Sequence, residues 1–109
     1  QVQEQTKLQP ETNDEYLSDG IYHLNNGNYD KALERFNHLE DQNEDNPYLD
    51  YLVALTYLKK EETENCLKYL KAAIEKDNHY KVIAHNEPDF DSLLDNDEFV
   101  TLIEVEESF

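Results

Sequence analysis

An internal repeat is the feature that most constrains how this chain of 109 residues can fold. Gly20 aligns with Ala54, and Phe36 aligns with Leu70 at the same offset along the chain. The other pairs matched at this offset are Leu17 with Tyr51, Ile21 with Leu55, His23 with Tyr57, Leu24 with Leu58, Ala32 with Cys66, Leu33 with Leu67, and Leu39 with Ala73. Such a repeat predicts one supersecondary unit that is built twice, with neighbouring copies packed together.

The first copy contains two segments whose apolar residues recur at helical spacing. One helix is predicted from Asp14 onward, and a second over residues 29–40. Residues 25–28 interrupt the pattern between them. Gly27 suits a positive φ in that break, and Asn28 suits the N-cap position of the second helix.

The second copy predicts helices over residues 47–59 and 63–76. Asn46 is a suitable N-cap for the first of them, and Pro47 suits the first helical position, where no N–H is needed. The whole chain has only 2 Gly and 3 Pro, too few for the many tight turns of an all-β fold. We therefore predict an all-α chain.

Further helical signals follow the second copy. Residues 79–86 predict a shorter helix that residues 77–78 can cap, and residues 89–94 predict a helical turn. Asp95, with Glu98 three residues later, predicts a capping box. It would open a last helix that carries Phe99, Leu102 and Ile103.

Small residues at matched positions indicate how the two helices of each copy pack. Gly20 on the first helix and Ala32 on the second leave room for the backbones to cross closely, and Phe36 fills the adjacent hole. Ala54, Cys66 and Leu70 repeat this arrangement in the second copy. The pattern predicts an antiparallel helix pair in each copy.

These residues resemble the tetratricopeptide repeat family. The first unit matches the family's signature positions with Tyr16, Gly20, Gly27, Asn28, Tyr29, Asp30, Ala32, Leu33, Phe36 and Leu39. The second unit keeps Ala54, Tyr57, Leu67, Leu70, Ala73 and Asp77. It departs from the family pattern with Glu61 at the usual turn glycine, Thr63 at the aromatic position and Cys66 at the alanine position. Glu44 stands where the first unit would have a closing proline, and residues 84–99 resemble segments that end groups of such repeats.

The resemblance implies a right-handed stack of antiparallel helix pairs, an α-solenoid, with a C-terminal capping helix. We expect a mobile leader at residues 1–13, followed by a single domain over residues 14–109. Within that domain, the first repeat spans about 14–45, the second about 46–78, and a degenerate end unit about 79–109.

The family's usual role is protein–protein recognition without catalysis, on a concave groove lined by the first helix of each repeat. The resemblance places nine residues in this groove: Leu17, Ile21, Leu24, Asn25, Tyr48, Tyr51, Leu55, Leu58 and Lys59. The groove would be apolar and aromatic, suited to a peptide or helix of a partner protein. One variety of the family clamps a C-terminal carboxylate through Lys, Arg and Asn, and Leu17 and Ile21 at two of those positions disfavour it.

Two alternatives to an open groove remain. The last helix could fold back, so that Phe99, Leu102 and Ile103 cover Tyr51 and Leu55 in a self-capped structural domain. The same surface could instead pair two copies of the chain, so both a monomer and a homodimer are compatible with the sequence.

Acidic residues outnumber basic ones by 26 to 9, which gives a formal net charge of -17. This imbalance argues against binding to nucleic acid or anionic lipid. No apolar run reaches the length of a membrane-spanning helix. After Lys81 the chain has nine acidic residues and no Lys or Arg. That stretch is either a solvated face or an acidic rim that selects a partner with basic flanks.

Neither a catalytic nor a metal motif stands out, so we expect no enzyme activity, no cofactor and no metal. His79 and His85 are too far apart in sequence for one face of a helix, and Cys66 at a small-residue position is expected to be buried. A weaker hypothesis is metal-dependent or hydrolytic chemistry centred on these histidines, Glu87 and Asp89. Because the first residue is Gln1, we expect prior trimming or removal of a signal peptide, and the location is cytoplasmic, periplasmic or secreted.

Overall fold

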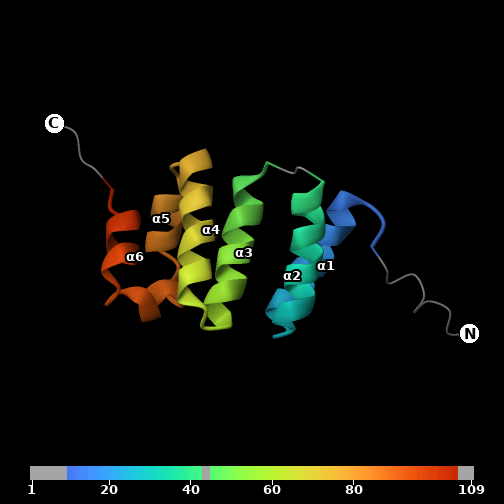
Figure 1. Ribbon diagram of the computed structural model, residues 1–109, viewed down its shortest axis with the longest axis horizontal. Helices are drawn as coiled ribbons and strands as arrows, with labels where there is room; N and C mark the ends of the chain where they lie inside the picture. The colour runs from blue at the N-terminus through green and yellow to red at the C-terminus, as the bar shows by residue number, and fades with distance from the viewer. Residues whose placement is uncertain (1–9, 43–44, 106–109) are drawn as a thin grey trace, which may run out of the picture. The chain divides into compact units, whose positions relative to one another are not determined.

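The structure, a computed structural model, describes residues 10–42 and 45–105, which are all-helical (Figure 1). No β-strand occurs in these two ranges, and the all-α prediction is confirmed. The elements are α1 (Asn13–Asn25), α2 (Tyr29–Asp41), α3 (Pro47–Lys59), α4 (Thr63–Lys76), α5 (Tyr80–His85), the 3₁₀ helix η2 (Pro88–Leu93) and α6 (Asp97–Leu102). The prediction of a leader at residues 1–13 lies largely outside the described residues, which begin at residue 10. The last residue of that predicted leader, Asn13, is the first residue of α1.

The chain divides into two compact units, Gln1–Glu44 and Asp45–Phe109. The division falls beside the predicted boundary between the first and second repeats. Unit 1 contains the antiparallel pair of α1 and α2, and unit 2 contains α3 to α6 with η2. Within unit 2, α3 and α4 pack along their lengths, η2 contacts α3, and α5 and α6 contact α4 (Figure 1).

The repeat is visible in the helix bounds. The first and last residues of α3 follow those of α1 at the same sequence separation that relates Gly20 to Ala54. The first residue of α4 follows the first residue of α2 at this separation too. The turns of the two hairpins also share their hydrogen bonds, which form a Schellman motif at each helix end. The N–H groups of Gly27 and Asn28 donate to the carbonyls of Leu24 and His23 at 3.2 and 2.8 Å, and those of Glu61 and Glu62 donate to Leu58 and Tyr57, both at 2.9 Å.

Both turns place one residue in the left-handed region of the backbone. Gly27 has φ of 81° and Glu61 has φ of 63°. Glycine adopts this conformation without steric cost, whereas a residue with a Cβ does not. Both hairpins therefore require a left-handed residue at this position of the turn. In unit 2 the residue is Glu61, whose backbone is strained there.

The close approach predicted within the first helix pair is confirmed in unit 1. A Cβ added at Gly20 would lie 2.9 Å from Cδ1 of Phe36, well inside contact distance. Phe36 and Ala32 are fully buried beneath α1. In unit 2 the equivalent Ala54, Cys66 and Leu70 are likewise fully buried. A glycine on one helix thus makes room for an aromatic ring on the other.

The helix caps agree with the sequence at α3 and differ at α6. Asn46 Oδ1 accepts the N–H of Tyr48 at 2.9 Å, with Pro47 at the first helical position, as predicted. At α6 the prediction of Asp95 as the cap is wrong. Asn96 is the N-cap, and its Oδ1 accepts the N–H of Phe99 at 2.9 Å. Phe99, whose N–H makes this capping bond, has its side chain fully buried in the core.

The core of unit 2 joins all five of its helical elements. The rings of Phe90 from η2 and Phe99 from α6 are fully buried and stack with their centroids 5.3 Å apart. Two ion pairs lie at the C-terminal end of α4, where Lys76 Nζ is 2.7 Å from Asp50 Oδ2 and 2.9 Å from Asp45 Oδ1. The hydrogen bonds that Lys76 donates to the carboxylates of Asp45 and Asp50 raise its pKa. The ring contact joins η2 to α6, and the ion pair of Lys76 with Asp50 joins α4 to α3.

Candidate binding site

The predicted groove residues of unit 1 lie on α1. Leu24 is buried, Leu17 and Ile21 are half-buried, and Asn25 is exposed at the end of the helix. An ion pair of Arg35 Nε on α2 and Asp19 Oδ2 on α1, 2.6 Å apart, joins the two helices of unit 1. Leu24, because it is buried, offers no surface to a partner.

The predicted groove residues of unit 2 lie on α3, and only two of them are exposed. Tyr48 is 41% exposed, whereas Tyr51 is only 5% exposed. The Tyr51 ring packs against the rings of Tyr80 and Phe90, at centroid distances of 5.2 and 6.1 Å. The C-terminal elements of this unit therefore cover the centre of the α3 face.

The remaining groove residues of α3 confirm that coverage. Leu58 is buried and Leu55 is half-buried against the same core. Lys59 is exposed, but its Nζ forms an ion pair with Asp89 Oδ2 of η2 at 3.2 Å. Sequence reasoning considered Phe99, Leu102 and Ile103 as the cover. The aromatic contacts on Tyr51 come instead from Tyr80 and Phe90, which lie earlier in the chain.

Tyr51 carries a buried hydroxyl that lacks a hydrogen-bond partner among the described residues. Burial raises the pKa of Tyr51 well above its ordinary value, and the nearby carboxylates of Glu87 and Asp89 raise it further. The phenol is therefore held neutral, as a packing group of the core.

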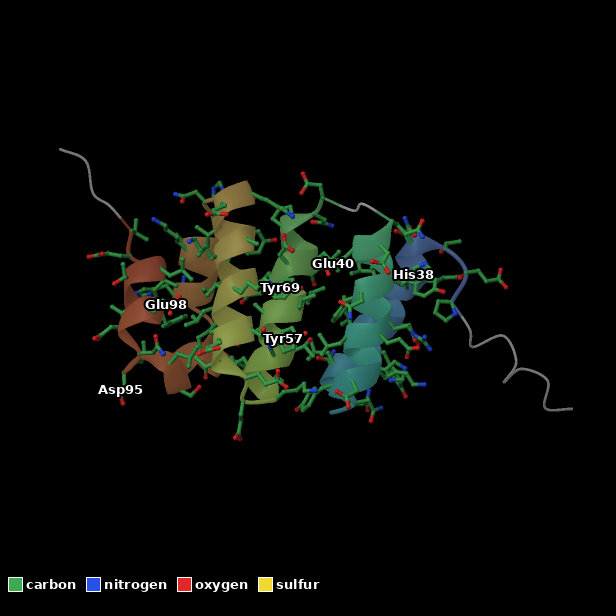
Figure 2. All side chains as sticks on the ribbon, viewed as in Figure 1. His38, Glu40, Tyr57, Tyr69, Asp95 and Glu98 are labelled. Carbon is green, nitrogen blue, oxygen red and sulfur yellow. The ribbon has the colours of Figure 1, made fainter. Side chains whose placement is uncertain are left out.

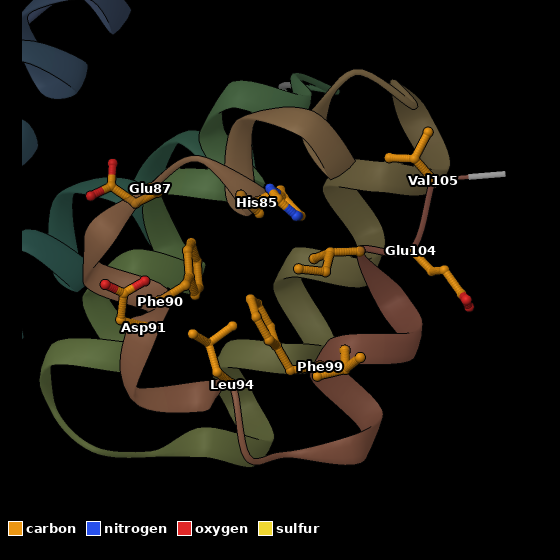
Figure 3. A pocket seen from close by; sticks show the side chains of 11 residues that line it. His85, Glu87, Phe90, Asp91, Leu94, Phe99, Glu104 and Val105 are labelled. Atoms are coloured by element: carbon orange, nitrogen blue, oxygen red, sulfur yellow. The ribbon is translucent and has the colours of Figure 1, made fainter. Parts of the chain in front are cut away.

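An open apolar cavity lies elsewhere in unit 2, between α5, η2 and α6 (Figure 3). We call it the terminal pocket. Its volume is about 580 Å³. Its walls are mostly apolar: Ala84, Phe90, Leu94, Phe99, Val100, Ile103 and Val105. Three of these are exposed large side chains, Leu94 at 57%, Val105 at 51% and Val100 at 43%. The terminal pocket is therefore an accessible apolar surface of unit 2.

Carboxylates surround the terminal pocket. Glu87 and Asp91 lie at one edge and Glu104 at the opposite edge, with Phe90, Leu94 and Phe99 between them (Figure 3). We call these three acidic residues the rim. Within the described part of the chain, no Lys or Arg forms an ion pair with any of them. Glu87 Oε2 accepts the N–H of Asp89 at 3.1 Å, which fixes the start of η2.

Other surface features are less enclosed. Tyr57 of α3 and Tyr69 of α4 stack with centroids 5.8 Å apart (Figure 2). In unit 1, Tyr16 stacks on His38 at 3.7 Å, beside a shallow and largely polar depression. Each of these aromatic pairs joins two neighbouring helices, which is a packing role.

Of the residues considered for chemistry, His85 and Glu87 both line the terminal pocket, and Glu87 Oε2 accepts the N–H of Asp89. His79 is exposed, and its backbone N–H and Nδ1 lie 3.0 and 3.1 Å from Asp77 Oδ1. Cys66 is fully buried, and desolvation raises the pKa of its thiol to about 12. Over residues 10–42 and 45–105, no three His, Cys, Asp or Glu side chains gather as a metal site would require.

Over the described ranges, no helix combines the length and apolar character needed to cross a bilayer.

Sequence reasoning did not find the terminal pocket, although it identified most of its residues separately. Phe99 and Ile103 were considered as a possible cover of the α3 face, and Glu87, Asp91 and Glu104 belonged to the acidic stretch after Lys81. The missing information was that α5, η2 and α6 are short and do not close over one another. A run of alternating acidic and apolar residues between short helices is the signal that could have indicated it.

Comparison with known protein families, curated proteins and solved structures finds no match to this chain. The geometry therefore carries the functional argument.

Proposed function

We propose that this protein is a non-enzymatic interaction module that binds a peptide or helix of a partner protein in the terminal pocket. The observation that carries the proposal is an open apolar cavity of about 580 Å³, with Leu94, Val100 and Val105 exposed around it. Ligand sites are typically concave and apolar, with a few polar groups at the edge. Exposed apolar side chains that gather at one place typically mark an interaction surface.

We further propose that the two hairpins are tetratricopeptide-like and stack in a right-handed sense. Their support is the single offset that relates the helix bounds of the two hairpins, and the same Schellman hydrogen bonds at both turns. The glycine that admits the Phe36 ring has the small-residue role expected of such a pair. In this view α5, η2 and α6 are the degenerate end unit.

The pocket is a better candidate than the α3 face because Tyr51 and Leu58 are already buried. A partner segment would have to displace Tyr80 and Phe90 from the Tyr51 ring before it could bind there. Substitution of Tyr51 with a charged residue would consequently test folding rather than binding.

A second candidate is a self-capped structural domain. It is favoured by the packing of Tyr80 and Phe90 on Tyr51 and by the ion pair of Lys59 with Asp89. If the C-terminal elements act only as a cap, the terminal pocket would have no partner to bind. The two candidates therefore differ in whether the pocket binds a peptide at all.

A selection of random peptides against three forms of the protein tests the proposal. The forms are the original chain, Leu94→Asn/Val100→Asn in the pocket, and Val82→Asn/Ile83→Asn as a matched control on α5. Val82 and Ile83 are 47% and 41% exposed and do not line the pocket. Both variants exchange two exposed apolar side chains without a change of charge, and circular dichroism verifies that each is folded.

We expect peptides that bind the original chain and the control but bind the pocket variant at least ~10-fold more weakly, since two apolar contacts are lost. Peptides lost only from the control variant would move the site to α5. If no peptide binds any folded form, the self-capped domain becomes the better description.

A further inference from the structure

We infer that the terminal pocket takes an apolar segment that carries Lys or Arg on both flanks. This inference rests on the proposed function and specifies the chemistry of the partner. Its basis is the separation of the carboxylates at the rim, Glu87 and Asp91 at one edge and Glu104 at the other (Figure 3). The exposed aliphatic side chains of Leu94, Val100 and Val105 supply the apolar contact.

The rim is free to bind an external cation. No Lys or Arg of the described chain forms an ion pair with Glu87, Asp91 or Glu104, whereas nearby Asp89 is paired with Lys59 at 3.2 Å. After Lys81 the sequence has no Lys or Arg at all. The carboxylates at both edges therefore favour a cationic flank, and among the described residues His85 is the one basic side chain that lines the pocket.

The pocket is large enough for a few side chains of a partner segment, but not for the surface of a folded domain. Its volume of about 580 Å³ lies within the usual range of small ligand sites. Phe90 and Phe99 form a stacked, fully buried pair beneath the exposed side chains that line it, so the base of the pocket is well packed. A short segment can thus place apolar side chains against the exposed Leu94, Val100 and Val105 while its flanks reach the two edges.

A second copy of the chain is a poor occupant. Each chain has a formal net charge of -17, so self-association would bring like charges together. Near the pocket, contact between two copies would place the rim of one against the acidic C-terminal stretch of the other. A cationic partner instead gains from the same charges.

Binding of three synthetic peptides measures the inference directly. Each peptide has the same apolar centre, Leu-Phe-Ala-Leu, and is flanked on both sides by two Lys, two Gln or two Glu. Fluorescence anisotropy of a labelled terminus gives the affinity for the full chain at low and high NaCl. We expect the Lys peptide to bind roughly 10-fold more tightly than the Gln peptide at low salt, and the Glu peptide to bind least.

Two variants with equal charge changes separate the rim from the overall charge. The rim variant is Glu87→Gln/Asp91→Asn/Glu104→Gln, in which Gln can still accept the N–H of Asp89. The control is Glu61→Gln/Glu64→Gln/Glu75→Gln, three exposed residues away from the pocket. We expect the preference for Lys over Gln to fall to about 2-fold or less in the rim variant and to persist in the control.

Four results would overturn the inference. Equal affinity for the Lys and Gln peptides would show that the flanks are not recognised, and the proposed function would stand. Equal effects of the two variants would assign the preference to the net charge of the chain. Sedimentation that shows a dimer lost on Leu94→Asn/Val100→Asn would make a second copy the occupant. No binding of any peptide would contradict the proposed function itself.

Discussion

The contact of Gly20 with Phe36 determines how closely α1 and α2 can approach. A Cβ at Gly20 would lie 2.9 Å from Phe36 Cδ1. We expect Gly20→Ala to lower the free energy of unfolding of unit 1 by ~1–3 kcal/mol, because overpacking outweighs the better helix propensity of alanine. Urea unfolding followed by circular dichroism measures the change. Gly20→Ala/Phe36→Leu should recover part of the loss, and no loss in the single variant would contradict the close contact.

The hydroxyl of Tyr51 is a buried polar group without a partner among the described residues. We expect Tyr51→Phe to raise the free energy of unfolding by ~1 kcal/mol at pH 7, because an unpaired buried group carries a desolvation cost. Tyr22→Phe, at a side chain that is 60% exposed, is the control and should change little. A less stable Tyr51→Phe protein would mean that the hydroxyl makes a hydrogen bond in solution.

The same tyrosine gives a pH dependence with a definite sign. The pKa of Tyr51 is raised in the folded state above its ordinary value of 10.0. Above that pH the unfolded chain loses the proton and the folded chain retains it, so stability falls as the pH rises. The advantage of Tyr51→Phe over the original chain should therefore increase above pH 10. Thermal unfolding at pH 7, 9 and 11 tests this increase.

At the scale of elements, the helix-to-helix turn is the feature that the two hairpins share most closely. Both turns require a positive φ, which Gly27 and Glu61 provide. We expect Glu61→Gly to stabilise unit 2 by ~1 kcal/mol, because a left-handed conformation is strained for a residue with a Cβ. The same change at Glu64, in the first turn of α4, should instead destabilise by a similar amount. If urea unfolding shows that both substitutions change the free energy of unfolding in the same direction, the turn geometry is contradicted.

The start of α6 depends on a cap that sequence reasoning placed one residue too early. Asn96 Oδ1 accepts the Phe99 N–H at 2.9 Å. We expect Asn96→Ala to lower the free energy of unfolding by ~1 kcal/mol, whereas Asn96→Asp should retain the cap. Asp95→Ala should leave stability nearly unchanged. If Asp95→Ala is the more damaging substitution in urea unfolding, Asp95 is the functional cap.

The C-terminal elements also show the limit of sequence prediction. The helices at 47–59 and 63–76 were predicted with the observed bounds. The first is apolar on nearly all sides, and Asn46 and Pro47 mark its start, whereas the second has a clear apolar face at helical spacing. Residues 80–102 contain short helices of six residues each, whose stability comes from packing on α3 and α4. Local pattern cannot locate the ends of such elements, because tertiary contacts select them.

At the scale of the whole molecule, repulsion between carboxylates dominates the electrostatics. The formal net charge of -17 is spread over only 109 residues. We expect an increase from ~20 to ~200 mM NaCl to raise the midpoint of thermal unfolding by roughly 3–6 °C, because salt screens this repulsion. Glu61→Gln/Glu64→Gln/Glu75→Gln should respond less to salt. A midpoint that falls with salt would mean that ion pairs such as that of Lys76 with Asp50 dominate instead.

The sequence by itself determined the all-α class, the two hairpins and the role of Gly20, because these depend on spacing, turn residues and side-chain size along a contiguous stretch. Tertiary structure decided which apolar residues remain accessible. Tyr51 was a candidate for recognition from its position on α3, yet Tyr80 and Phe90 bury it. Leu94 and Val100 are exposed at the terminal pocket because α5, η2 and α6 are too short to cover them. Accessibility depends on contacts between distant segments, and local sequence pattern does not encode those contacts.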